Sequence, residues 1–188
     1  MPVDEPIIAF ADVASCEAWF ERHHADHGGF LAKLGKGDRA TVTYQDVLTV
    51  ALCFGWIDGQ KRGFDDAYWL QRFTRRGSRS KWSKINRDKA EALIASQEMR
   101  PAGQVAIDAA KADGRWDAAY AGSATATVPD DLASALAADP AAEAFFATLS
   151  GNNRYAILYR VQDAKKPETR AARIAKFVAM CGRHETIH

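Results

Sequence analysis

The hydrophobic positions in the first third of the chain change between extended and helical spacing, which is typical of a mixed α+β fold. Residues 6–10 form a short apolar run that predicts a strand, and Asp12 is placed to cap a helix whose apolar side chains recur every three or four positions. Residues 30–34 predict a second strand after a glycine pair. Thr43 then opens another helix, with Asp46 three positions later in the manner of a capping box.

A β-hairpin is predicted for residues 56–74, where the side chains alternate with the period of a strand. The turn falls at the acidic pair Asp65-Asp66. Strict alternation places five side chains of the first strand on one face: Trp56, Asp58, Gln60, Arg62 and Phe64. A basic loop over residues 75–80 and a helix capped by Ser83 are expected to follow.

Beyond residue 100 the chain has helix signals and no strand pattern. An alanine-rich helix is predicted over residues 102–112, and the small polar run at 122–127 is the linker candidate. The helices that follow begin at prolines or at a capping serine. We therefore predict an α+β fold with a small antiparallel sheet packed by helices in residues 1–121, and a compact C-terminal helical unit in residues 128–188.

Composition and charge exclude disorder and indicate local charge complementarity. Hydrophobic residues make up 47% of the chain and charged residues 26%, which is ordinary for a globular protein of 188 residues. The formal net charge of +1 hides four blocks of alternating sign. Residues 60–89 carry +7 and residues 150–188 carry +5, whereas residues 1–59 carry −5 and residues 90–149 carry −6. This pattern favours internal pairing or a local anion site over a general nucleic-acid coat.

The three cysteines and the N-terminal sequence favour a cytoplasmic protein. Cys16, Cys53 and Cys181 show no CxxC spacing and lie in apolar helical patterns, so we expect reduced thiols in the core. The first 15 residues show no signal-peptide pattern, and no apolar run reaches the roughly 20 residues that span a bilayer. We expect a protein without a membrane span that is a monomer or a weak dimer.

Several sequence motifs, which occur in a fixed order along the chain, resemble those of a known family. The string CFGWIDGQKRGFDDAYWLQRFTRRGSRSKWSKIN is followed by MRPAG, by VPDDLASAL and by NRYAILYRVQDAKKPETRAARIAKFVAM. Together they resemble the YdeI/OmpD-associated family, some members of which are labelled bacteriocin-protection proteins. The resemblance runs from the first helix to the last, and residues 128–182 correspond to the part that defines the family. It implies a link to stress or antimicrobial-peptide tolerance, with no established reaction.

The segment between residues 54 and 86 is the candidate site, because tryptophans, glycines and cations gather there. Arginine suits a carboxylate or phosphate since its planar guanidinium donates two parallel hydrogen bonds, and a helix start nearby adds donors. The candidate ligand-binding residues are Trp56, Asp58, Lys61, Arg62, Trp69, Arg72, Arg76, Trp82, Ser83 and Asn86. The competing interpretation is a solvated basic loop paired with the acidic blocks, with the tryptophans in the core.

The leading hypothesis is a non-enzymatic stress-protection protein with a pocket for a small anionic ligand near the hairpin. One alternative is a single-stranded nucleic-acid binding protein, because aromatic rings interleaved with cations suit stacked bases and phosphates. Another is an enzyme that uses Asp58 as an acid or base, although a lone aspartate defines no reaction. His23 and His27 have a helical spacing that would suit a metal, but we interpret them as a surface cluster. No cofactor and no metal is predicted.

Overall fold

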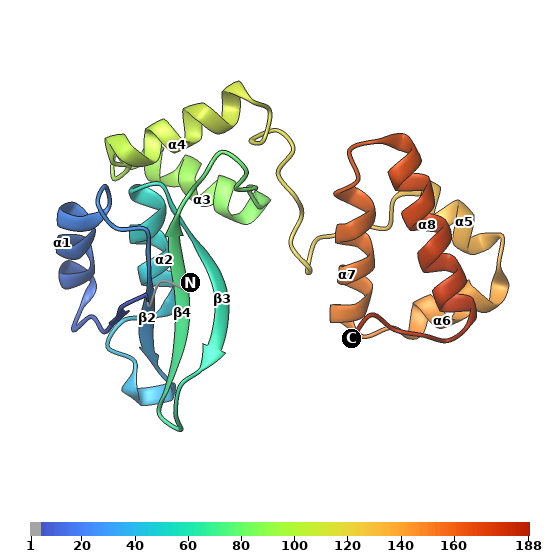
Figure 1. Cartoon of the computed structure of the whole chain (residues 1–188), viewed down its shortest axis with the longest axis horizontal. Helices are drawn as coiled ribbons and strands as arrows, with labels where there is room; N and C mark the ends of the chain where they lie inside the picture. The colour runs from blue at the N-terminus through green and yellow to red at the C-terminus, as the bar shows by residue number, and fades with distance from the viewer. Residues whose placement is uncertain (1–4) are drawn as a thin grey trace. The chain divides into compact units, whose positions relative to one another are not determined.

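The structure, a computed structural model that describes residues 5–188, consists of two compact units (Figure 1). The first unit ends at Ala119 and the second begins at Tyr120. The expected limits were 1–121 and 128–188, of which residues 1–4 lie outside the described part of the chain. That each unit is an independently folding domain stays a prediction.

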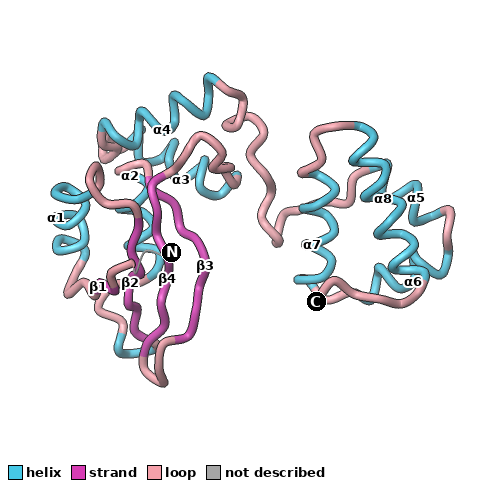
Figure 2. The backbone as a smooth tube through the Cα atoms, viewed as in Figure 1, coloured by secondary structure: helices cyan, strands magenta, loops and turns pink. Residues whose placement is uncertain are grey.

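A four-stranded sheet forms the centre of the first unit, and the predicted α+β class is confirmed (Figure 2). Its strands are β1 (Ile7–Ile8), β2 (Gly29–Gly35), β3 (Trp56–Gly63) and β4 (Tyr68–Arg75), in the order β1-β2-β4-β3. Strand β4 pairs antiparallel with β2 on one side and with β3 on the other, as expected. The short β1 instead runs parallel to β2, because a helix connects the two strands.

In residues 5–119 the first unit also contains four α-helices and one short 3₁₀ helix. The helices are α1 (Val13–His23), α2 (Tyr44–Cys53), α3 (Lys84–Ala95) and α4 (Pro101–Ala112), with the 3₁₀ turn at Gly37–Arg39. Asp12 and Thr43 cap α1 and α2 as the sequence predicts, each through a reciprocal capping box. Ser83 caps α3 by accepting the Asn86 backbone N–H at 3.1 Å.

Aromatic side chains fill the core between the sheet and α1. Phe20 of α1, Phe30 of β2, Trp56 of β3 and Phe73 of β4 are each 0% exposed. The ring centroids of Phe20 and Trp56 are 5.3 Å apart in an edge-to-face arrangement, and Phe30 stacks on Phe73 at 5.6 Å. Burying each of these side chains contributes roughly 1.5–3 kcal/mol, so this cluster helps to hold α1 on the sheet.

The face assignment predicted for the first hairpin strand is wrong because β3 contains a bulge. Asp58 pairs with Phe73, but the register shifts before Lys61, which pairs with Gln71. The extra residue reverses the alternation, so Arg62, which pairs with Leu70, lies on the face opposite Asp58. The hairpin is therefore as predicted up to the bulge, and the two faces exchange beyond it.

A close backbone contact fixes α4 at the end of the sheet where β3 begins and β4 ends (Figure 1). A Cβ on Gly103 of α4 would overlap the carbonyl oxygen of Cys53, so only glycine allows this approach. Gly55 has φ +75°, and a Cβ there would lie 2.9 Å from the Ala102 carbonyl oxygen. The Arg76 N–H donates to the Gly55 carbonyl at 3.0 Å. The end of α2, the start of α4 and the end of β4 are thereby held together.

The second unit contains four helices, and α8 is the central one. They are α5 (Asp130–Ala137), α6 (Pro140–Thr148), α7 (Gly151–Gln162) and α8 (Pro167–Gly182), and α8 contacts each of the others. The core is apolar and includes Leu132, Phe146, Ile157, Val161, Ile174, Phe177 and Cys181. The compact helical unit predicted from the sequence is confirmed.

Arg170 and Arg173 of the KKPETR..R motif join three of these helices. The Arg170 guanidinium forms a bidentate pair with Asp131 at the start of α5, and it also donates to the Val161 carbonyl of α7 at 3.0 Å. Arg173 donates to the Arg160 carbonyl, also near the end of α7. Cations at a helix C-terminus are favourable, since the last carbonyls there lack partners in their own helix. Both arginines of this motif therefore have a structural role.

The two units should unfold separately, and tryptophan fluorescence can distinguish them. All five tryptophans lie between residues 19 and 116, in the first unit, whereas far-UV circular dichroism also reports the helices of the second. In a urea titration of the full chain, we expect the two signals to have different midpoints. A fragment of residues 120–188 should reproduce the part of the dichroism transition that fluorescence does not follow. Coincident transitions together with an unfolded fragment would contradict two domains.

Replacement of Arg170 by methionine should destabilise the second unit by about 1 kcal/mol, the scale of a partly exposed ion pair. The Arg170 guanidinium lowers the pKa of Asp131 below its ordinary value. The stabilisation is therefore present at neutral pH and is lost as the pH falls through the lowered pKa. The difference between wild type and Arg170→Met in the dichroism transition should shrink in acid.

Arg183→Met is the matched control for this substitution, because the Arg183–Glu185 ion pair is exposed on both sides and lies two residues apart in the sequence. We expect this control to unfold like the wild type at both pH values. An equal loss in the two variants, or a loss in Arg170→Met that does not change with pH, would contradict the structural role of the Arg170–Asp131 pair.

Candidate functional site

A cavity of about 520 Å³ in the first unit lies where β4 runs into the basic loop, and we call it the arginine cavity. Its walls come from the end of α1, the end of α2, the β4–α3 loop, α4 and the segment after α4. The residues that line it are His24, Ala25, Phe54, Gly55, Arg75, Arg76, Gly77, Ser78, Ala102, Val105, Ala106, Ala109, Asp113 and Arg115.

Backbone carbonyls and an aromatic ring hold the three arginines of this cavity. Arg75 donates from Nη1 to the Ala25 carbonyl at 2.6 Å. The Arg76 guanidinium carbon lies 3.5 Å from the centroid of the Trp82 ring, and its Nη1 donates to the Lys81 carbonyl at 3.0 Å. Arg115 donates to the Ser80 carbonyl at 2.9 Å. A carbonyl does not neutralise a guanidinium, so these contacts orient the three cations without adding a negative charge.

One carboxylate reduces the positive charge of the cavity. Asp113 accepts from Arg115 Nε at 2.7 Å, and Arg115 also bonds to the loop carbonyls. Among the described residues that line the cavity, three arginines therefore face one aspartate. The cavity keeps an excess of positive charge that suits an anion.

His24 adds a ring nitrogen to the same wall. Its Nδ1 lies 2.8 Å from the Phe20 carbonyl, which can only accept, so Nδ1 carries the hydrogen. The His24 ring also packs on Phe54 with centroids 5.1 Å apart, which fixes its orientation.

Of the ten residues predicted from the sequence, only Arg76 lines the arginine cavity. Trp82 is 1% exposed and supports the Arg76 guanidinium from the core, where it also contacts Trp116 at 4.8 Å. Trp56 is 0% exposed and donates from its indole to the His24 carbonyl at 3.2 Å. Both rings are core residues beside the cavity, so we leave them out of the ligand contacts that we propose.

Ser83 and Asn86 serve the start of α3. Ser83 is the cap described above, and Asn86 is 8% exposed at the third helical position. Neither side chain lines the arginine cavity. We interpret both as residues that begin the helix after the basic loop.

Asp58, Lys61 and Trp69 form a separate polar cluster on the helix-covered face of the hairpin. The Tyr44 hydroxyl donates to Asp58 Oδ2 at 2.9 Å, which links the start of α2 to β3. Lys61 Nζ lies 4.1 Å from the centroid of the Trp69 ring, and the Tyr44 ring is 6.2 Å from that ring. The Asp58 carboxylate therefore takes part in a hydrogen bond that holds α2 on the sheet.

Arg62 and Arg72 lie on the opposite face of the sheet. Arg72 forms a bidentate pair with Glu5, with Nε to Oε2 at 2.7 Å, and this pairing lowers the pKa of Glu5. Arg62 is exposed and pairs through its backbone with Leu70. The basic segment is thus divided: Arg75 and Arg76 enter the cavity, whereas Arg62 and Arg72 are directed away from it.

Sequence reasoning missed His24, Asp113, Arg115 and the α4 wall. Arg115 is 35 residues from the Ser80 carbonyl that it contacts, and no spacing rule connects them. The signal that could have found it is Trp116, a large aromatic beside a charged residue after a helix end, which packs on Trp82 in the structure. A site assembled from segments this far apart in the sequence can be recognised only when the fold is known.

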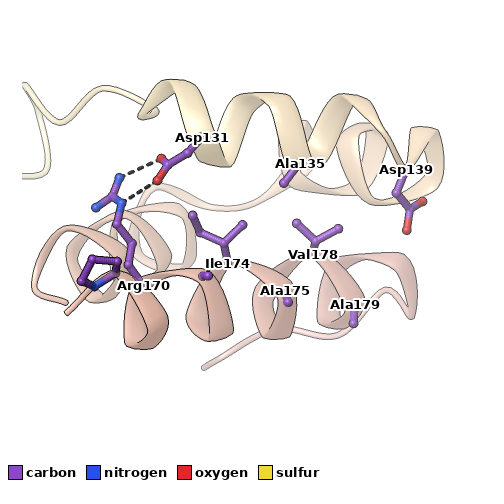
Figure 3. Close-up of a pocket in the computed structure, with 10 residues that line it drawn as sticks. Asp131, Ala135, Asp139, Arg170, Ile174, Ala175, Val178 and Ala179 are labelled. Atoms are coloured by element: carbon purple, nitrogen blue, oxygen red, sulfur yellow. Dashed lines mark hydrogen bonds and ion pairs between the residues drawn. The ribbon is translucent and has the colours of Figure 1, made fainter. Parts of the chain in front are cut away.

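A second concave surface lies in the other unit, between α5 and α8 (Figure 3). This groove encloses about 560 Å³, and Ile174 and Val178 project from α8 toward α5, beside Ala135. The Asp131–Arg170 pair closes one end and Asp139 lies at the other. Its polar groups are engaged in structural bonds, since Asp139 accepts the Ala142 N–H at 3.1 Å as the cap of α6. The groove offers an apolar surface without converging polar groups.

The cysteines do not offer a nucleophile to either surface. All three are buried free thiols. Burial raises the pKa of Cys16 to about 12 and that of Cys53 to about 11, and it also raises the pKa of Cys181. A thiolate is the reactive form, so these thiols are unreactive at neutral pH.

Among residues 5–188, no helix combines the length and the hydrophobicity needed to cross a membrane.

Two family models match separate parts of the chain. The first, described as a domain of unknown function, DUF8412, matches residues 8–106, which is more than half of the chain. The second, described as Bacteriocin-protection, YdeI or OmpD-Associated, matches residues 125–184. The resemblance stated from the sequence is therefore confirmed for the C-terminal helices, whereas the hairpin and its surroundings match the other model.

The boundary between the two matches falls near the boundary between the two units, so each unit corresponds to one family model. Comparison with curated proteins and with solved structures gave no match. The chain belongs to the DUF8412 family, and its C-terminal unit carries the segment described as Bacteriocin-protection, YdeI or OmpD-Associated.

Proposed function

We propose that this protein is a non-enzymatic binding protein that holds a small anion in the arginine cavity. The observation that carries the proposal is the set of three guanidinium groups, from β4, the basic loop and the segment after α4, around one cavity of about 520 Å³. Their contacts to backbone carbonyls orient them before a ligand arrives. Preorganised donors lose little conformational entropy on binding, which favours affinity.

The chemistry of the cavity suits binding of a carboxylate, phosphate or sulfonate. Each arginine presents several N–H donors in a planar group, and an oxyanion accepts two of them at once. Asp58, the carboxylate considered as an acid or base, does not line this cavity and is bonded to Tyr44. The nucleic-acid and enzyme alternatives stay predictions that no contact described above favours.

The cellular role that we propose follows from the C-terminal match. The description of that family includes bacteriocin protection, and the matching segment covers all four helices from α5 to α8. We therefore place the anion-binding function in stress or antimicrobial-peptide tolerance, in a bacterial cytoplasm. In this proposal, the first unit binds the anion, and the second unit carries the role in bacteriocin protection that the description of its family suggests.

Calorimetric titration with methanesulfonate, whose charge is constant near neutral pH, should detect binding to the wild-type protein. Arg75→Ala should weaken this binding about tenfold or more, because a hydrogen bond to a charged group contributes roughly 1.5–3 kcal/mol. Arg115→Lys should also weaken it, since lysine keeps the charge but loses the planar fork.

Arg62→Ala is the matched control, because it removes an exposed arginine of the same basic segment on the opposite face of the sheet. We expect its affinity to equal that of the wild type, and thermal unfolding of each variant would verify that the fold is retained. If Arg62→Ala weakened binding as much as Arg75→Ala, the anion would be attracted by the basic segment as a whole and not by the cavity.

A further inference from the structure

We infer that the ligand of the arginine cavity is an amphiphilic anion, an aryl or alkyl group that carries one oxyanion head. This inference rests on the proposed anion binding and adds the chemical class of the ligand. It follows from the unequal walls of the cavity: cations lie on the side of the β4–α3 loop, and α4 forms an apolar wall.

The apolar wall is a regular stripe along α4. Ala102, Val105, Ala106 and Ala109 line the cavity at positions i, i+3, i+4 and i+7, which is the spacing of one helix face. The core-facing side of α4 is a different one, because its buried residues are Gly103, Ile107 and Ala110. The helix therefore has a second apolar face that the fold itself does not cover.

Among residues 5–188, Val105 is the most exposed large hydrophobic side chain, with 67% of its surface accessible. Scattered exposed apolar residues are ordinary on protein surfaces. Val105 differs because it lies in a concave wall, beside the small side chains of Ala102 and Ala106, and shares the cavity with Phe54. Small residues leave the room that a flat apolar group needs.

The size of the cavity supports the same class of ligand. Pockets for small organic molecules enclose roughly 300–1,000 Å³, and this one encloses about 520 Å³. An inorganic anion would contact the arginines and leave the α4 wall in contact with water. An anion with a ring or a short chain would cover Val105 and release that water, which is favourable.

The test compares two ligands with the same head: methanesulfonate and benzenesulfonate. Calorimetric titration at constant pH should show benzenesulfonate to bind at least about tenfold more tightly, as expected for burial of a ring-sized apolar surface. Val105→Ser should reduce that preference, because benzenesulfonate has a ring to cover Val105 and methanesulfonate has none. Val13→Ser is the matched control, since Val13 is 40% exposed at the start of α1 and does not line the cavity.

The outcomes separate this inference from the anion-binding proposal. Equal affinity for the two sulfonates, both weakened by Arg75→Ala, would overturn the amphiphilic class and keep the anion site. Tight benzenesulfonate binding that neither Arg75→Ala nor Val105→Ser changes would place the ligand elsewhere and overturn the inference. Absence of binding by both sulfonates at millimolar concentration would overturn the proposed function and this inference together.

Discussion

The close backbone approach of α4 to the end of α2 is the constraint on which the arginine cavity depends. Gly103 allows the helix to meet the Cys53 carbonyl, and Gly55 takes a left-handed conformation beside Ala102. The same Gly55 carbonyl accepts the Arg76 N–H, so the basic loop starts at a fixed point relative to α4. Without this contact, the cationic side and the apolar wall would belong to elements that could move apart.

The basic residues of the chain are divided among several structural roles. The +7 block of residues 60–89 is not one patch, because the bulge in β3 and the alternation of β4 direct its arginines to different faces. Arg72 is committed to Glu5, and the C-terminal arginines Arg170 and Arg173 hold helix ends. In the cavity, Arg75, Arg76 and Arg115 also donate to neutral carbonyls, and a carbonyl orients a cation without cancelling its charge.

Local signals were sufficient for most of the fold. The caps at Asp12 and Thr43, the hairpin turn and the prolines that open helices are set by residues within a few positions of one another. The bulge after Asp58 was not predictable, since one extra residue in a strand leaves no mark in the hydrophobic pattern beyond a glycine. Its consequence was that Arg62 was assigned to the wrong face.

The candidate site was predictable only in part, because its residues come from segments far apart in the sequence. The basic loop was found from composition, but His24 and Arg115 approach it only through the packing of α1 and of Trp116. The tryptophans that made residues 54–86 conspicuous mostly support the core, and Trp82 acts through Arg76. Large aromatics beside cations therefore indicated the neighbourhood of the cavity and not its lining.

The most direct test of the central claim is an NMR titration of the arginine Nε–H resonances with methanesulfonate. If the anion binds in the arginine cavity, the signals of Arg75, Arg76 and Arg115 should shift together with one dissociation constant. The signals of Arg62 and Arg72 should stay in place, because they lie on the opposite face of the sheet. Shifts confined to Arg62 and Arg72, or equal small shifts of all arginines, would contradict the account.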